Sequence, residues 1–282
     1  MAKFSAVRFL EASGGEDAPL WLWGIPYDGT MSHRPGARFG PDEIRNASQG
    51  IESYSPYQGK DLVDLVIHDA GNIDLPFSSP EKAVEEIRSF ARDLLRRGIR
   101  SCVMGGEHSA SAPLVGAAFE RYPDLAVLHF DAHCDMRQSY GGNPLSHASV
   151  ARRILDFLPA FRYYALGMRS GDRDEFEFAR ALPHFHPFTL KDVPAVADSI
   201  PKDRPLYVTL DLDILDTAFF PGTGAPEPMG VSVKALHDAL LRFKGFRIVG
   251  ADVMELSPHY DHSRASSAVA SFIVREMLLL MG

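Results

Sequence analysis

Three side chains that can bind a metal ion lie close together in the segment LHFDAHCD, residues 128–135. They are Asp131, His133 and Asp135, and they come at the end of an apolar run that is typical of a buried strand. Side chains two positions apart on a strand point to the same face, so we expect these three to point together. Burial of unpaired charge is costly, and a bound cation would offset that cost. The segment therefore indicates a metal site.

Two other apolar runs end in the same types of residue. TLDLDILD places Asp211 and Asp213 two positions apart, and VMGGEHS leads through two glycines to His108. If only one strand ended in this way, the simplest interpretation would be that its acidic side chains are solvated or cap the next helix. Three of them would bring buried like charges together, which repel unless a cation neutralises them. Two imidazoles and four carboxylates suit two divalent cations with shared carboxylates, and the absence of a thiolate favours Mn²⁺-like ions over structural Zn²⁺.

The elements that must position these residues alternate along the chain. Seven apolar runs read as strands buried on both faces: 19–25, 64–71, 99–106, 125–131, 162–168, 204–213 and 246–256. Amphipathic segments at 79–98, 231–243 and 266–281 read as helices, and Asp42 and Glu43 are expected to open another. This alternation predicts an α/β protein with a mostly parallel sheet covered by helices on both faces, in a single domain of residues 1–282. Ligands bind outside the carboxyl ends of such strands.

Composition narrows the class of protein. The 282 residues carry a net charge of −8, which argues against a nucleic-acid binder with a basic face. No apolar run approaches the ~20 residues that span a bilayer, and residues 1–17 lack the apolar region of a secretory signal, so we expect no membrane partner. The two cysteines, Cys102 and Cys134, form no CxxC pair. We interpret both as packing residues of a protein from the reducing cytoplasm.

Four motifs taken together carry a family resemblance. GGEHS, DAHCD, TLDLDILD and DVMEL resemble the ureohydrolase family, which includes arginase, agmatinase, guanidinobutyrase and formimidoylglutamase. The match runs in order from GIPYDGT to the last predicted helix, and the ordered set is far more specific than each motif alone. RPGARFGPDEIR and PGTGAPEPMG are similar to segments of the agmatinase branch. The family's GGDHS appears here as GGEHS, with a longer acid beside His108.

The resemblance implies a three-layer α/β/α fold and two Mn²⁺ ions per subunit. One ion would be held by His108, Asp131, Asp135 and Asp211. The other would be held by Asp131, His133, Asp211 and Asp213, which makes Asp131 and Asp211 the shared ligands. The family also implies a homo-oligomer, a trimer or hexamer.

The implied reaction is hydrolysis of a guanidinium group to urea and an amine. A metal pair lowers the pKa of water, so that hydroxide can attack the guanidinium carbon at neutral pH. By resemblance, Asp135 and His147 carry protons to the leaving nitrogen, and Glu255 orients the guanidinium through parallel hydrogen bonds. Without the resemblance, His147 would read as a surface histidine at a helix start and Glu255 as a solvated strand-end acid. Asp252 is expected to support the site from behind.

The similarity to the agmatinase branch favours agmatine as the substrate, and its hydrolysis would give putrescine for polyamine biosynthesis. Because of Arg137, guanidino acids and arginine remain possible substrates. If the Arg137 side chain points into the pocket, it would attract a substrate carboxylate. If it is paired with an acid such as Asp28 or Glu227, agmatine would remain the preferred substrate. Two other classes are a mononuclear zinc deacetylase-like amidohydrolase and a catalytically silent metal-binding protein. The other histidines predict no site. His129 and His237 show no surrounding constellation, and His184 and His186 lack a nearby acid.

Overall fold

The computed structural model describes residues 7–76 and 79–282, so eight of the residues in the expected 1–282 domain lie outside it. Its main feature is an eight-stranded sheet in which every neighbouring pair of strands is parallel. In spatial order the strands are β4 (Ile67–Asn72), β1 (Leu20–Gly24), β5 (Arg100–Met104), β10 (Ile248–Met254), β9 (Leu206–Asp211), β6 (Ala126–Phe130), β7 (Tyr163–Leu166) and β8 (Phe185–His186).

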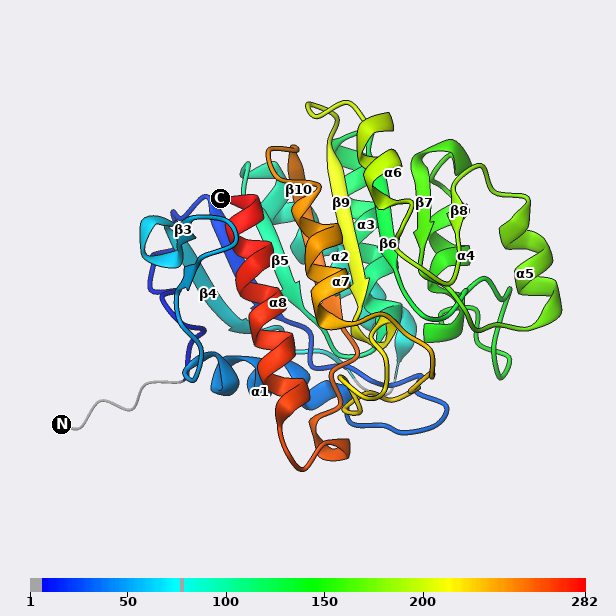
Figure 1. Cartoon of the computed structure of the whole chain (residues 1–282), viewed down its shortest axis with the longest axis horizontal. Helices are drawn as coiled ribbons and strands as arrows, with labels where there is room; N and C mark the ends of the chain where they lie inside the picture. Colours follow the sequence, from blue (N-terminus) through cyan, green and yellow to red (C-terminus); the bar gives the residue numbers. More distant parts are fainter. Residues whose placement is uncertain (1–6, 77–78) are drawn as a thin grey trace.

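Helices cover both faces of the sheet and complete three layers (Figure 1). One face carries α1 (Gly40–Ser48), α6 (Val193–Ser199), α7 (Val233–Leu241) and α8 (Ala265–Met281). The other carries α2 (Pro80–Arg96), α3 (Ser111–Arg121), α4 (Val150–Leu155) and α5 (Arg173–Arg180). Strand residues alternate between the two cores: Leu22 packs with the first set, and Trp21 and Trp23 with the second. The predicted α/β/α class is therefore confirmed.

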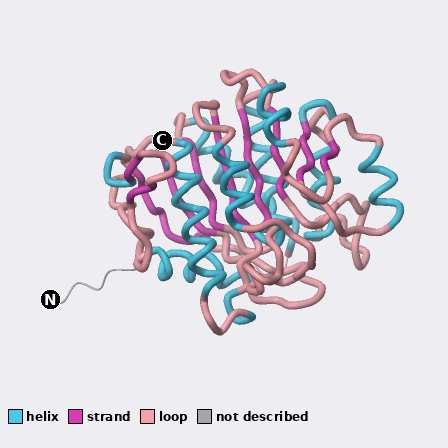
Figure 2. The backbone as a smooth tube through the Cα atoms, in the orientation of Figure 1, coloured by secondary structure: helices cyan, strands magenta, loops and turns pink. Residues whose placement is uncertain are grey.

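All seven expected strands form, as do the four expected helices. The sequence did not predict β8, nor the small antiparallel pair β2 (Tyr54–Ser55) and β3 (Lys60–Asp61), each only two residues long. The longest predicted helix begins as expected, because the Ser79 hydroxyl accepts a hydrogen bond from the Lys82 N–H at 3.3 Å. Loops at the carboxyl ends of the strands gather along the lower edge of the molecule (Figure 2).

The N-terminal end of α8 gives a pH-dependent stability prediction. Burial opposes ionisation of Asp261, but hydrogen bonds from Ser263 and Ser266 outweigh it and lower its pKa to about 2. The ionised form therefore stabilises the fold above pH ~4, and this contribution disappears as the pH falls towards 2. We expect Asp261→Asn to lower the free energy of unfolding by about 2 kcal/mol at pH 7 and by almost nothing at pH 2. Urea unfolding at both pH values checks this; an equal loss at both would contradict it.

Candidate metal centre

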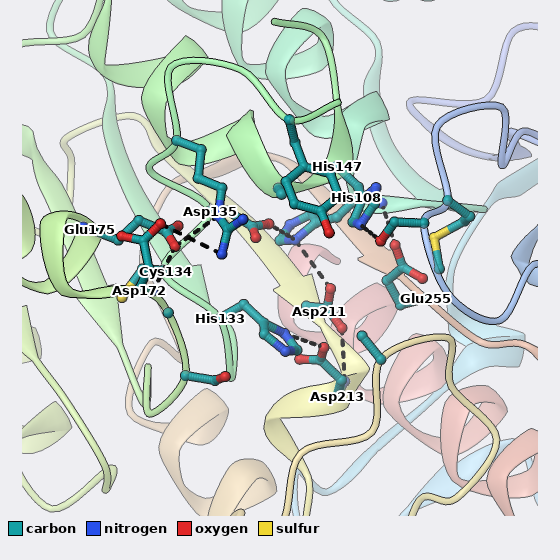
Figure 3. A pocket seen from close by; sticks show the side chains of 18 residues that line it. His108, His133, Cys134, Asp135, His147, Asp172, Glu175, Asp211, Asp213 and Glu255 are labelled. Atoms are coloured by element: carbon teal, nitrogen blue, oxygen red, sulfur yellow. Dashed lines mark hydrogen bonds and ion pairs between the residues drawn. The ribbon is translucent and has the colours of Figure 1, made fainter. Parts of the chain in front are cut away.

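Four neighbouring strands, β5, β10, β9 and β6, end at the same place, and three of them, β5, β9 and β6, deliver the predicted metal ligands. His108 opens the short turn that follows β5, Asp131 follows β6, and Asp211 is the last residue of β9. Because parallel strands end at one edge of the sheet, residues separated by about a hundred positions meet there. Figure 3 shows the labelled ligand side chains pointing toward one another.

Tight turns, rather than continued strand, align the two aspartate motifs. Strand β6 stops at Phe130, so the prediction that 131–135 would alternate along a strand is wrong. The Asp131 Oδ1 accepts a hydrogen bond from the His133 N–H at 2.6 Å, and Asp211 Oδ1 accepts one from the Asp213 N–H at 2.8 Å. Each first aspartate thus fixes the turn that carries the next ligand. Asp135 has a positive φ of 50°, a conformation that only its surroundings can hold in place.

The histidines and aspartates form one connected, buried group. His108 Nδ1 lies 3.0 Å from Asp131 Oδ2, 3.2 Å from Asp211 Oδ2 and 3.7 Å from Asp135 Oδ2. His133 Nδ1 lies 2.8 Å from Asp213 Oδ2 and 3.8 Å from Asp131 Oδ1. The six predicted ligands are therefore brought together, with Asp131 between the two histidines.

Charge repulsion within this group perturbs its carboxylates. Burial and the neighbouring Asp131 raise the pKa of Asp135 well above its usual range, and burial with Asp213 and Asp131 does the same to Asp211. Burial disfavours a charged His108, but the adjacent carboxylates of Asp131 and Asp211 raise its pKa well above the usual value. A cluster with these shifts needs added positive charge to stay ionised at neutral pH.

The donor atoms fit metal ions. Within the described part of the chain, buried His108 Nδ1 has no hydrogen-bond partner, although it faces two carboxylates. Two groups of donor atoms lie within metal-binding reach, His108 with His129 and Asp131, and Asp131 with His133 and Asp213. Both contain Asp131, which is the arrangement expected of a ligand shared by two cations. Nitrogen and oxygen donors without a thiolate suit Mn²⁺.

His129 is a member of this group that the sequence interpretation missed. Its Nε2 lies 3.0 Å from Asp131 Oδ2 and its Nδ1 lies 2.5 Å from the Tyr163 hydroxyl, so the expectation that it has no constellation is wrong. His129 lies two positions before Asp131 in the sequence, and this spacing could have predicted that it belongs to the same group. The predicted support from Asp252 has a clear geometry: its Oδ1 accepts a hydrogen bond from Thr209 Oγ1, which contacts His108 Nε2 at 2.9 Å.

A cavity of about 340 Å³ opens directly onto the cluster, and both His147 and Glu255 line it. One Glu255 oxygen accepts a hydrogen bond from the His108 N–H at 2.8 Å. Its other oxygen, Oε2, is buried and has no hydrogen-bond partner among the described residues. Glu255 also has a positive φ of 69°, so the backbone is held in an unusual conformation to present this side chain. The free acceptor is where a cationic donor would bind.

Arg137 lines the same cavity, and acids neutralise it. Its Nε donates to Glu175 Oε2 at 3.0 Å, and its guanidinium lies 3.7 Å from Asp172. These partners are not the acids named from the sequence. Asp28 pairs with Arg38 instead, and Glu227 lies 4.0 Å from His133 Nε2.

The remaining expectations are partly confirmed. Cys102 and Cys134 are buried free thiols packed in opposite cores, although Cys134 also borders the cavity. His186 Nδ1 lies 3.5 Å from Asp192, so the statement that it lacks an acid is wrong. His237 Nε2 lies 3.2 Å from Glu276 Oε2, so the expectation that it has no surrounding constellation is wrong, although it does not line the cavity. In the described residues we find no helix with the length and apolar character needed to traverse a bilayer.

Comparisons with known proteins agree with this geometry. The family model described as "Arginase family" matches residues 18–280. An agmatinase of Bacillus subtilis is 42% identical over 97% of this chain and 99% of its own length. A crystal structure of a putative agmatinase from Clostridium difficile superposes with a TM-score of 0.91 at 36% identity, over 94% of this chain and 98% of that one. The crystal structure of the agmatine ureohydrolase of Thermoplasma volcanium superposes with a TM-score of 0.87 at 29% identity, over 99% of this chain and 95% of that one.

Proposed function

Since this chain belongs to the arginase family of hydrolases, we propose that it hydrolyses agmatine to putrescine and urea at a pair of Mn²⁺ ions. The observation that carries the proposal is the buried, unpartnered Glu255 Oε2, which opens into the cavity that holds the His and Asp cluster. A guanidinium placed there would meet a carboxylate acceptor and the candidate metal ligands at once. We further propose one ureohydrolase domain, a homo-oligomer and a cytoplasmic location.

Six residues would hold the metals: His108, Asp131, Asp135, Asp211, His133 and Asp213. Bound divalent cations would neutralise the clustered carboxylates and supply hydroxide at neutral pH by lowering the pKa of water. Glu255 would orient the guanidinium through its free oxygen. Asp135 would hold a proton on its carboxylate, and His147 would pass a proton to the leaving amine from its ring nitrogen.

The neutralised Arg137 favours agmatine over guanidino acids. Its positive charge is compensated by Glu175 and Asp172, so that the far wall of the cavity carries two acids and one base. Such a wall attracts a terminal ammonium and repels a carboxylate. The test is urea release with Mn²⁺ from agmatine, arginine, 4-guanidinobutyrate and 3-guanidinopropionate. Agmatine should give the highest kcat/KM, and release of urea from none of them would refute the proposal.

Glu175→Gln should change this preference. Glu175 accepts hydrogen bonds from the Met136 and Asp172 N–H groups and from Arg137, and Gln keeps an acceptor but removes the charge. With only the more distant Asp172 left to compensate Arg137, we expect KM for agmatine to rise about 10-fold and kcat/KM for 4-guanidinobutyrate to increase. Asp174→Asn, an exposed position on the same helix, is the matched control. Unchanged constants for both substrates would contradict the assignment of this wall.

His147→Ala tests the proton carrier. The ring lies at the cavity and its pKa is lowered, chiefly by burial, which favours the neutral imidazole that can accept a proton. We expect kcat to fall about 100-fold while two metal ions per chain remain bound. Urea assays with metal analysis measure both. Loss of metal would contradict the assignment, because it would make His147 part of the metal site.

A further inference from the structure

We propose that Glu107 is a positioning residue that acts through Thr30 and fixes which ring nitrogen of His147 carries the proton. The inference rests on the proposed function, because it assigns a cause to the proton state of the residue proposed to serve the leaving amine. Glu107 is the longer acid of GGEHS.

Glu107 is fully buried beside the metal cluster, and three donors occupy its two oxygens. The Thr30 N–H donates to Oε2 at 2.7 Å. The hydroxyls of Thr30 and Ser109 both donate to Oε1. In addition, the Glu107 N–H donates to the Tyr27 carbonyl at 2.7 Å. The loop that contains Thr30 is therefore tied to the segment carrying His108 through both main chain and side chain.

Thr30 in turn holds His147. The His147 N–H donates to Thr30 Oγ1 at 2.9 Å, and the ring Nδ1 lies 3.4 Å from the same oxygen. On the other side of the ring, Nε2 lies 3.3 Å from Ser32 Oγ. One loop thus contacts both nitrogens of the imidazole, and Met31 and Ser32 from this loop line the cavity together with His147.

The count of donors and acceptors sets the tautomer. A threonine hydroxyl has one hydrogen, and here Glu107 accepts it. Thr30 Oγ1 can therefore only accept from the imidazole, which favours the proton on Nδ1. The Ser146 hydroxyl, also 3.4 Å from Nδ1, can either donate or accept and so imposes neither tautomer. Nε2 is left with its lone pair facing the Ser32 hydroxyl at the cavity, where it can take a proton and return it. Without the acid at 107, the Thr30 hydroxyl is free to donate to Nδ1, which would place the proton on Nε2 instead.

The direct test is the tautomer of His147 measured by two-bond ¹H–¹⁵N correlation spectra of histidine-labelled protein, metal-free and with diamagnetic Mg²⁺. His147→Asn assigns the signals. Wild type should show the proton on Nδ1, whereas Glu107→Gln and Thr30→Val should move the population to Nε2. Thr30→Ser, which keeps the hydroxyl, should restore Nδ1–H. Thr30→Val also keeps the test decisive if Glu107→Gln does not fold.

Ser109→Ala is the matched control, because it removes another donor to the same Glu107 oxygen without touching Thr30. It should retain Nδ1–H; a change equal to that in Thr30→Val would overturn the inference. In the Mn²⁺ enzyme we expect kcat of Glu107→Gln to fall about 10-fold, with an altered pH profile and unchanged metal content. Wild type with the proton on Nε2, but active on agmatine, would refute the inference alone. Absence of urea release with Nδ1–H present would refute the proposed function alone.

Discussion

Asp131→Asn is expected to lower kcat by about 10³-fold or more and to leave the protein with at most one tightly bound metal ion. Asp131 is fully buried, and its two oxygens face different histidines, Oδ2 toward His108 and Oδ1 toward His133. An amide offers one acceptor oxygen and no negative charge, so it cannot serve two cations at once. Metal analysis after dialysis and a urea assay measure the two effects.

Asp198→Asn is the control for this prediction, because Asp198 is exposed on α6 and the substitution has the same chemistry. It should leave both metal content and kcat unchanged. If Asp131→Asn retained two metals per chain with nearly normal turnover, Asp131 would not be a shared ligand. The assignment of all six ligands would then have to be revised.

Glu276→Ala is expected to cost about 3–5 kcal/mol of folding free energy. Glu276 is fully buried in α8 and accepts hydrogen bonds from Ser55, Gln58 and the Arg275 guanidinium, and it contacts His237. Truncation leaves the Arg275 charge buried without its carboxylate and removes the side-chain hydrogen bonds from Ser55 and Gln58 that join the β2–β3 segment to the C-terminal helix. The shift of the urea unfolding midpoint measures the loss.

Two variants make this result interpretable. Glu276→Gln keeps the shape and an acceptor oxygen, so it should lose less than Glu276→Ala. Glu177→Ala removes an exposed glutamate from α5 and should stay within about 0.5 kcal/mol of wild type. Equal stability of Glu276→Ala and Glu177→Ala would show that the buried network contributes nothing measurable.

The convergence of the proposed metal ligands could be predicted because residue spacing and strand order determine where these side chains lie. Asp211 and His108 follow apolar runs whose buried character is visible in the sequence, and parallel strands bring such ends together. Strand alternation was the wrong reason for the alignment at 131–135, since the backbone turns there through hydrogen bonds between side chain and main chain. The turns at Asp131 and Asp211 are both local, because each aspartate accepts a hydrogen bond from the N–H two residues on. A prediction based on strand alternation alone does not include this use of aspartate.

Contacts made by loops could not be predicted from the sequence. Thr30 lies 77 positions from Glu107, and nothing in the spacing of either residue indicates their hydrogen bond. The partner of Arg137 was also misjudged, because the chain path between β7 and α5 decides which acids reach it. His129 is different, because its spacing of two residues from Asp131 was sufficient to predict that it lies in the same group.

The position of β10 has a consequence for biosynthesis. This strand and β9 are the last two strands made, yet they lie between β5 and β6 in the sheet. During synthesis on the ribosome, two sets of strands therefore form before the strands that join them: first β4, β1 and β5, then β6, β7 and β8. They cannot become one sheet until the final third of the chain emerges. If the chain binds the proposed pair of cations, the complete site forms only after that closure, so their acquisition would mark the end of folding and could not guide its beginning.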